Sequence, residues 1–166
     1  MRRGLTPSDL GDLFEQPLTA VISIGLADGS VFSRPVWHRL IDGRFVFEFP
    51  AGDRKIAMLQ RDPRATVVLA EDAFPYRAIE VRGRITMSPD RYHEIAAAIC
   101  RPYVEAFAPG ADVAAYMSDE PGMIGELEAE VTTCWDYADE EMMSLATGVV
   151  DPSENPKGLR SDGPHS

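Results

Sequence analysis

The chain has 166 residues, of which 45% are hydrophobic and 26% are charged, which is typical of a soluble globular domain with its own core. Its net charge of −11 argues against nucleic acid or an anionic membrane as the main partner, because both require a basic surface. No apolar run is long enough to span a bilayer, and the basic N-terminus is not followed by the apolar stretch of a signal peptide.

The N-terminal part of the chain predicts a short helix and then a strand. Pro7 near the start and the helical spacing of Leu10, Leu13 and Phe14 predict the helix over residues 5–17. Residues 18–26 form a run rich in β-branched side chains, which favours a strand.

Two hairpin signals predict an antiparallel meander. Asp28 and Gly29 lead into a return strand over residues 30–40, and Asp42 and Gly43 lead into the next strand. Pro35 lies within the return strand and indicates a bulge, a sheet edge or a bend. In residues 44–49 aromatic side chains alternate with β-branched and polar ones, which is typical of a strand with one buried face.

The run after this strand is the strongest candidate for a binding site. Asp53 is well placed to cap a helix over residues 54–61. Arg54 and Lys55 fall in its first turn, where cations are unfavourable because the helix N-terminus already carries partial positive charge. A bound phosphate would reverse the sign of that interaction. The alternative is a solvated Arg-Lys pair at an exposed helix start.

The second half of the chain continues the mixture of strands and helices. We expect strands over residues 65–70 and 76–87, a helix capped by Ser88 with Pro89 at its first position, a short helix over 113–117 and a strand over 122–137. Gly83 within the second of these strands predicts a bulge or a close backbone approach.

These elements predict a single mainly β domain over residues 1–147. About six antiparallel strands in sequential hairpins, with flanking helices, favour a small barrel over a sandwich. Residues 148–166 contain little to bury and are expected to be a disordered tail. Cys100 and Cys134 have no metal-ligand spacing, which favours a cytoplasmic protein with free thiols, and we expect no metal site.

Several runs together resemble the pyridoxamine-phosphate-oxidase-like split-barrel family, and more narrowly its flavin/deazaflavin oxidoreductase branch. The resemblance covers roughly residues 10–140 and rests on the order and spacing of residues 28–37, 42–47, 53–64 and 76–84, and on the closing Trp135 and Asp136. It implies a split β-barrel of the FMN-binding type. It also implies a homodimer with two cofactor sites at the subunit interface.

The resemblance also implies which residues form the site. Arg54 and Lys55 match positions that hold the cofactor phosphate. In the family one strand lies along the flavin ring, and its positions match Ser33, Pro35, Val36 and Trp37 here. The end of another strand lies beside the cofactor phosphate, and its positions match Phe49 and Pro50. We expect His38, Tyr76 and Trp135 at the substrate pocket, with His38 facing either substrate or solvent. No catalytic residue is assigned, because the chemistry belongs to the cofactor.

Three functions remain open on this basis. The first is an oxidoreductase that uses coenzyme F-420 to transfer hydride to or from a small organic substrate such as an enone or imine. The second is an FMN-dependent oxidase or reductase of the same family. The third is a non-catalytic protein that binds a cofactor or haem.

Overall fold

The computed structural model describes residues 4–90, 93–117, 120 and 122–138. The stretch 148–166, which the sequence predicts to be disordered, lies outside the described residues. The elements in chain order are η1 (Pro7–Phe14), β1 (Ala20–Gly25), β2 (Val31–Val36), β3 (Arg39–Ile41), β4 (Arg44–Phe49), α1 (Arg54–Arg61), β5 (Arg64–Ala70), β6 (Arg77–Pro89), α2 (Glu94–Phe107), η2 (Val113–Tyr116) and β7 (Met123–Asp136). Among the described residues, no helix has the length and hydrophobicity that crossing a bilayer requires.

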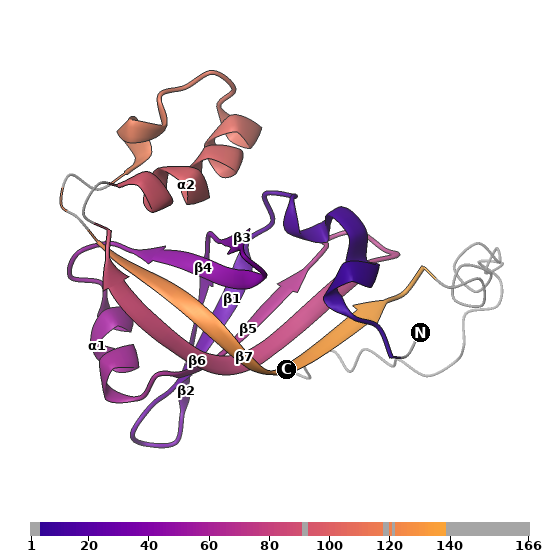
Figure 1. The fold of residues 1–166 in the computed structure, drawn as a ribbon, viewed down its shortest axis with the longest axis horizontal. Coiled ribbons are helices and arrows are strands. Elements are labelled where there is room, and N and C mark those ends of the chain that lie inside the picture. The colour runs from indigo at the N-terminus through magenta and orange to yellow at the C-terminus, as the bar shows by residue number, and fades with distance from the viewer. Residues whose placement is uncertain (1–3, 91–92, 118–119, 121, 139–166) are drawn as a thin grey trace, which may run out of the picture.

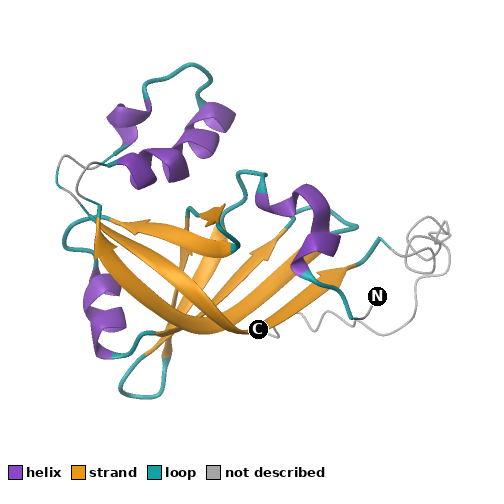
Figure 2. Ribbon diagram, in the orientation of Figure 1, coloured by secondary structure: helices purple, strands orange, loops and turns teal. Residues whose placement is uncertain are grey.

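The connection between β2 and β3 shows why the sheet closes into a barrel. All strand pairs are antiparallel, and the strand order is β2-β1-β5-β6-β7-β4-β3. The two edge strands, β2 and β3, are joined by only Trp37 and His38, so the sheet must curl until its edges approach each other. The curled sheet is visible in Figures 1 and 2 and confirms the expected mainly β split barrel.

The described residues contain seven strands instead of about six, because the predicted strand 30–40 is two strands. The chain leaves one edge of the sheet after Val36 and joins the other edge at Arg39. Pro35 lies on edge strand β2, where a missing N–H donor is tolerated. Asp42 and Gly43 both have positive φ, 49° and 76°, as a tight hairpin turn requires.

Gly83 forms the bulge that the sequence predicts. The register of β6 with β7 shifts between Arg82 and Gly83. A Cβ atom on Gly83 would lie 1.9 Å from the carbonyl oxygen of Glu128, so no other residue fits without a backbone shift. The bulge increases the local twist and bends the long β6–β7 pair around the barrel.

Two helix predictions need correction. The expected helix start at Ser88 is wrong, because β6 stays paired with β7 as far as Pro89 and α2 begins only at Glu94. The side chain of Asp90 accepts a hydrogen bond of 2.9 Å from the amide of Ala96 in the first turn of α2. The helix expected over residues 5–17 is a shorter 3-10 segment, η1, interrupted at Gly11, which has a φ of 57°.

The main core fills the barrel, and a smaller apolar cluster fastens α2 to its outside. The larger side chains buried in the barrel include Leu10, Leu13, Ile22, Ile24, Phe47, Phe49, Leu59, Leu69, Ile79 and Leu127. The second cluster joins Ile99 of α2 to Val46 and Ile124, with Trp37 packed against it. Figure 1 shows α2 and η2 standing together beside one end of the barrel.

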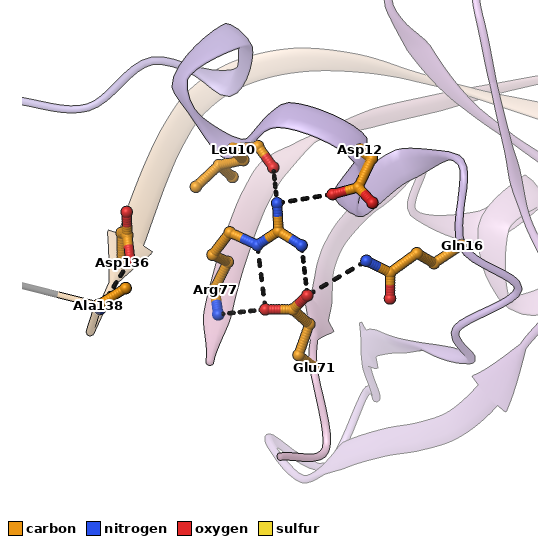
Figure 3. Close-up of polar contacts among 7 residues, drawn as sticks. All are labelled: Leu10, Asp12, Gln16, Glu71, Arg77, Asp136 and Ala138. Carbon is orange, nitrogen blue, oxygen red and sulfur yellow. Dashed lines mark hydrogen bonds and ion pairs between the residues drawn. The ribbon is translucent and has the colours of Figure 1, made fainter. Parts of the chain in front are cut away.

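A polar cluster centred on Arg77 fastens η1 to the other end of the barrel (Figure 3). The Arg77 guanidinium donates to the carbonyl of Leu10 at 2.7 Å and to Asp12 at 2.8 Å. It also makes a two-pronged contact with Glu71, which accepts a further bond of 3.2 Å from Gln16. Hydrogen bonds from Arg77 lower the pKa of Glu71 to about 2.

Candidate functional site

Asp53 caps α1 and also engages Lys55. One carboxylate oxygen of Asp53 accepts from the backbone amide of Lys55 at 2.8 Å, and the other lies 2.5 Å from the Lys55 ammonium. The same ammonium lies 5.6 Å from the centre of the Phe49 ring, and the Lys55 side chain is only 13% exposed. The cap confirms the prediction that Asp53 starts α1. The ion pair with Asp53, however, neutralises Lys55, which is one of the two cations expected at a phosphate.

The Arg54 guanidinium instead lies near the Phe32 ring, which Arg34 of β2 also contacts. The Arg54 guanidinium carbon lies 5.7 Å from the centre of the Phe32 ring, and that of Arg34 lies 4.6 Å from the same centre. Two guanidinium groups therefore gather around one phenyl ring, where the start of α1 meets edge strand β2. We refer to Phe32, Arg34 and Arg54 as the arginine corner.

Among the described residues, the two arginines of this corner have no acidic partner. Within the residues that the structure describes, neither Arg34 nor Arg54 forms an ion pair, although Arg34 donates locally to the carbonyl of Ser33 at 2.9 Å. Five other arginines each lie beside a carboxylate: Arg44, Arg64, Arg77, Arg82 and Arg84. Among the described residues Arg39, Arg61 and Arg101 also form no ion pair, so the distinguishing feature of Arg34 and Arg54 is that both lie at the Phe32 ring. In a chain with a net charge of −11, two adjacent unpaired guanidinium groups form a favourable site for an anion.

The sequence prediction did not include Phe32 and Arg34. The signal that reveals them is the alternation along β2, which places these two residues on the opposite face of the strand from Ser33 and Pro35. Phe32 is opposite Ile24 in the register with β1, on the barrel side, at the open edge of the sheet. The contact with Arg54 forms only when α1 packs against this edge.

Three of the four predicted ring-side residues lie around a shallow surface depression, and Ser33 lies on the outer face of the sheet. The Ser33 hydroxyl lies 2.8 Å from that of Ser23 on the outer face of the sheet. Pro35, Val36 and Trp37 line a depression of about 430 Å³ with Thr19. The indole of Trp37 stacks on the Tyr103 ring at 4.8 Å with an interplanar angle of 8°. The structure thus brings this part of the predicted ring-side strand beside α2.

His38 is part of the interior and does not face solvent. Its side chain is 2% exposed, its Nδ1 lies 3.0 Å from the hydroxyl of Tyr103, and its ring lies 5.1 Å from that of Phe45. Burial, with a smaller effect from Arg39, lowers the pKa of His38 to about 4. Its burial makes direct contact between the imidazole and a surface-bound substrate unfavourable.

Tyr76 and Trp135 lie at the opposite end of β6 from Phe49 and Pro50 within one chain. Trp135 is opposite Ala78, near the beginning of β6, and the Tyr76 ring lies 4.5 Å from that of Tyr137. Phe49 and Pro50 are at the other end of β6, because Phe49 is opposite Met123, which is opposite Pro89. A single chain therefore does not bring the predicted substrate residues to the predicted phosphate residues.

Comparison with known proteins shows which solved structures have a similar fold. No protein-family model matches the sequence, and no curated protein matches it. Among solved structures, a conserved hypothetical protein from Mycobacterium tuberculosis matches with a TM-score of 0.64 and 20% identity over 82% of this chain and 89% of that one. An F420 reductase matches with a TM-score of 0.62 and 20% identity over 77% and 98%. An FAD-binding protein from Mesorhizobium loti matches with a TM-score of 0.56 and 18% identity over 78% and 94%.

The protein is therefore a split β-barrel of the kind found among flavin- and F420-binding proteins. These neighbours agree with the family that the sequence resembles. At about 20% identity the likeness concerns the fold, and the activity has to be argued from the residues of this chain.

Proposed function

We propose that this protein is an oxidoreductase that uses coenzyme F-420 to transfer hydride to or from a small organic substrate, with FMN as the alternative cofactor. The observation that supports this most is the arginine corner, where Arg34 and Arg54 have no acidic partner among the described residues. A phosphate group fits there, because the nearby Asp53 carboxylate is already occupied by Lys55 and repels an anion less than a free carboxylate would.

In this proposal each part of the site has a physical task. Arg34 and Arg54 hold the phosphate, and Lys55 offsets the charge of Asp53 and helps to attract the anion. Pro50 borders the cofactor chain, whereas Phe49 is fully buried in the barrel core and does not contact it. Ser33, Pro35, Val36 and Trp37 orient the ring. A bound flavin or deazaflavin supplies the hydride chemistry, and the protein supplies binding and orientation.

We further propose that the working form is a homodimer in the cytoplasm. Tyr76 and Trp135 would complete the substrate pocket from the partner subunit, because one chain holds them at the opposite end of β6 from Phe49 and Pro50. The outer face of the sheet also exposes Val21, Val31 and Val131, with 41%, 64% and 45% of their surface accessible. A second copy would cover such an apolar surface.

Titration of F-420 and of FMN against single variants tests the cofactor site. We expect Arg34→Ala and Arg54→Ala each to weaken binding roughly ten- to a hundredfold, because each removes a charge-assisted contact. Lys55→Ala should also weaken binding, because it leaves the Asp53 carboxylate without its paired ammonium and so increases the repulsion of the anion. Arg44→Ala is the matched control, since Arg44 is 56% exposed and pairs with Glu126 on the surface. Equal affinity in the Arg34, Arg54 and Arg44 variants would reject the site.

Mixing two variants tests whether the site is shared between subunits. If Arg54→Ala and Trp135→Ala each impair binding of the preferred cofactor or substrate, the mixed dimer contains one site with both residues intact. We expect mixing followed by subunit exchange to restore tight binding. Additive defects without restoration, or a monomer by light scattering at micromolar concentration, would show that each chain binds alone. The visible spectrum of protein from its native host distinguishes bound flavin, deazaflavin and haem.

A further inference from the structure

Tyr103 of α2 stacks on the indole of Trp37, which lines the surface depression beside β2. The two rings are almost parallel, with 4.8 Å between their centres and an interplanar angle of 8°. Trp37 shares the lining of the depression with Thr19, Pro35 and Val36. Because Tyr103 covers one face of the indole, only the remaining surface of Trp37 is available to a molecule in the depression.

Hydrogen bonds at the hydroxyl fix the far end of the Tyr103 side chain. The hydroxyl donates to the carbonyl of Leu18 at 2.9 Å, accepts from the amide of His38 at 3.0 Å and lies 3.0 Å from Nδ1 of the same histidine. Leu18 precedes β1 and His38 lies between β2 and β3, so both partners belong to the barrel. The side chain is held by α2 at one end and by the barrel at the other. The indole stacked on it therefore has a neighbour that stays in one place.

Phe107, one helical turn further along α2, contacts the same indole in a different way. Its ring centre lies 6.4 Å from that of Trp37, with an interplanar angle of 38°, and the residue is 57% exposed. Tyr103 is only 5% exposed. A buried, stacked and hydrogen-bonded ring restrains the indole more than an exposed, tilted one. Because Tyr103 is shielded from solvent, its effect on a molecule in the depression must pass through Trp37.

We infer that Tyr103 is a positioning residue for the cofactor ring and that it acts through Trp37. The inference rests on the proposed function, in which Trp37 helps to orient the ring of F-420 or FMN. A side chain that orients a ligand has to be held within a fraction of an ångström by the residues that support it. Without the Tyr103 ring the indole of Trp37 has more than one orientation available. The cofactor must then order the indole on binding, which lowers the affinity.

Titration of F-420 and of FMN against variants of the full chain tests this role. We expect Tyr103→Leu, which removes the stacked ring, to weaken binding roughly three- to tenfold. Tyr103→Phe keeps the ring, so it should bind the cofactor as tightly as the wild type. Phe107→Leu is the matched control on the same helix and should change the affinity by less than about twofold. A wild-type protein that binds neither cofactor would overturn the proposed function and this inference with it, whereas unchanged affinity in Tyr103→Leu would overturn this inference alone.

A double-mutant cycle separates positioning from a general loss of structure. In a Trp37→Leu background there is no indole for Tyr103 to hold, so the effect of Tyr103→Leu on cofactor affinity should disappear. The same loss of affinity in both backgrounds would show that Tyr103 acts only through the stability of the fold, and would overturn the inference. If Tyr103→Leu does not fold, Tyr103→Met takes its place in the cycle.

The circular dichroism of Trp37 gives a readout without any cofactor. The chain contains two tryptophans, Trp37 and Trp135, so Trp135→Phe leaves Trp37 as the single indole. In that background we expect the near-ultraviolet signal of the indole to persist in Tyr103→Phe and to be largely lost in Tyr103→Leu, because only the phenylalanine variant keeps the stacked ring. An unchanged signal in Tyr103→Leu would show that Tyr103 does not hold the indole, and would overturn the inference.

Discussion

The hydroxyl of Tyr103 lies 3.0 Å from Nδ1 of His38 and donates to the carbonyl of Leu18 at 2.9 Å. The amide of His38 donates to the same hydroxyl oxygen at 3.0 Å. One phenol on α2 thus joins the β2–β3 connection to the segment before β1. Because the single proton of the Tyr103 hydroxyl goes to the Leu18 carbonyl, we assign the imidazole proton of His38 to Nδ1. Nε2 is then unprotonated and buried, and it has no hydrogen-bond partner among the described residues.

Removal of that hydroxyl should destabilise the protein without changing its fold. Tyr103→Phe leaves the amide and Nδ1 of His38 without their acceptor in a buried place. We expect the free energy of unfolding to fall by about 1–3 kcal/mol, as measured by urea unfolding. The phenyl ring should still stack on Trp37, so the near-ultraviolet spectrum should remain native-like. A loss below about 0.5 kcal/mol would mean that water replaces the hydroxyl.

The stability of the protein should decrease between about pH 6.5 and pH 4 because of His38. Its pKa in the folded state is about 4, below the ordinary value of 6.5, so only the unfolded state binds a proton in this window. The free energy of unfolding should fall by up to about 3 kcal/mol as the pH decreases through the window, with no further contribution below pH 4. His38→Phe should remove this slope, and parallel pH profiles of the two proteins would contradict the assignment.

The Glu71 carboxylate should stabilise η1 down to low pH. Its pKa is lowered from 4.5 to about 2, so its contribution is complete above pH 4.5 and is lost as the pH falls from there to about 2. Glu71→Gln should lower the free energy of unfolding at pH 7 by about 1–2 kcal/mol, allowing for solvent screening. Glu130→Gln is the control, because Glu130 is 57% exposed where it pairs with Arg84. A similar small effect in both variants would show that the Arg77 cluster adds no stability.

Two glycines in strands should respond oppositely to alanine. Gly83→Ala places a Cβ atom 1.9 Å from the backbone oxygen of Glu128, so the bulge must rearrange, and we expect a loss of about 3 kcal/mol or more. A Cβ on Gly25 meets no atom within 4 Å, so Gly25→Ala should be neutral or slightly stabilising. Thermal unfolding of both variants checks this. Equal melting temperatures would mean that the bulge is not a structural requirement.

Much of the fold could be predicted because its signals are local. The turn residues Asp42 and Gly43 adopt the positive φ angles that a tight hairpin needs, and Asp53 caps α1, whichever tertiary contacts surround them. The start of α2 could not be predicted in this way. Ser88 and Pro89 are good helix-starting residues, but pairing with β7, which lies far along the chain, keeps them in a strand.

The candidate site was only partly determined by the sequence. The position of Arg54 and Lys55 at a helix start is local, and the sequence alone placed them there. Only the tertiary structure decided that Asp53 engages Lys55 while Arg54 shares Phe32 with Arg34, because the latter contact depends on how α1 packs against the edge of the sheet.

The burial of His38 was likewise decided only by the tertiary structure. The alternation of residues near His38 does not reveal its environment, because the side chains that bury it lie on β4 and α2. The sequence by itself determined the hairpin turns and the Asp53 cap, since these depend on neighbouring residues. Closure of the barrel decided which side chains meet, because it brings together segments that are distant in the chain.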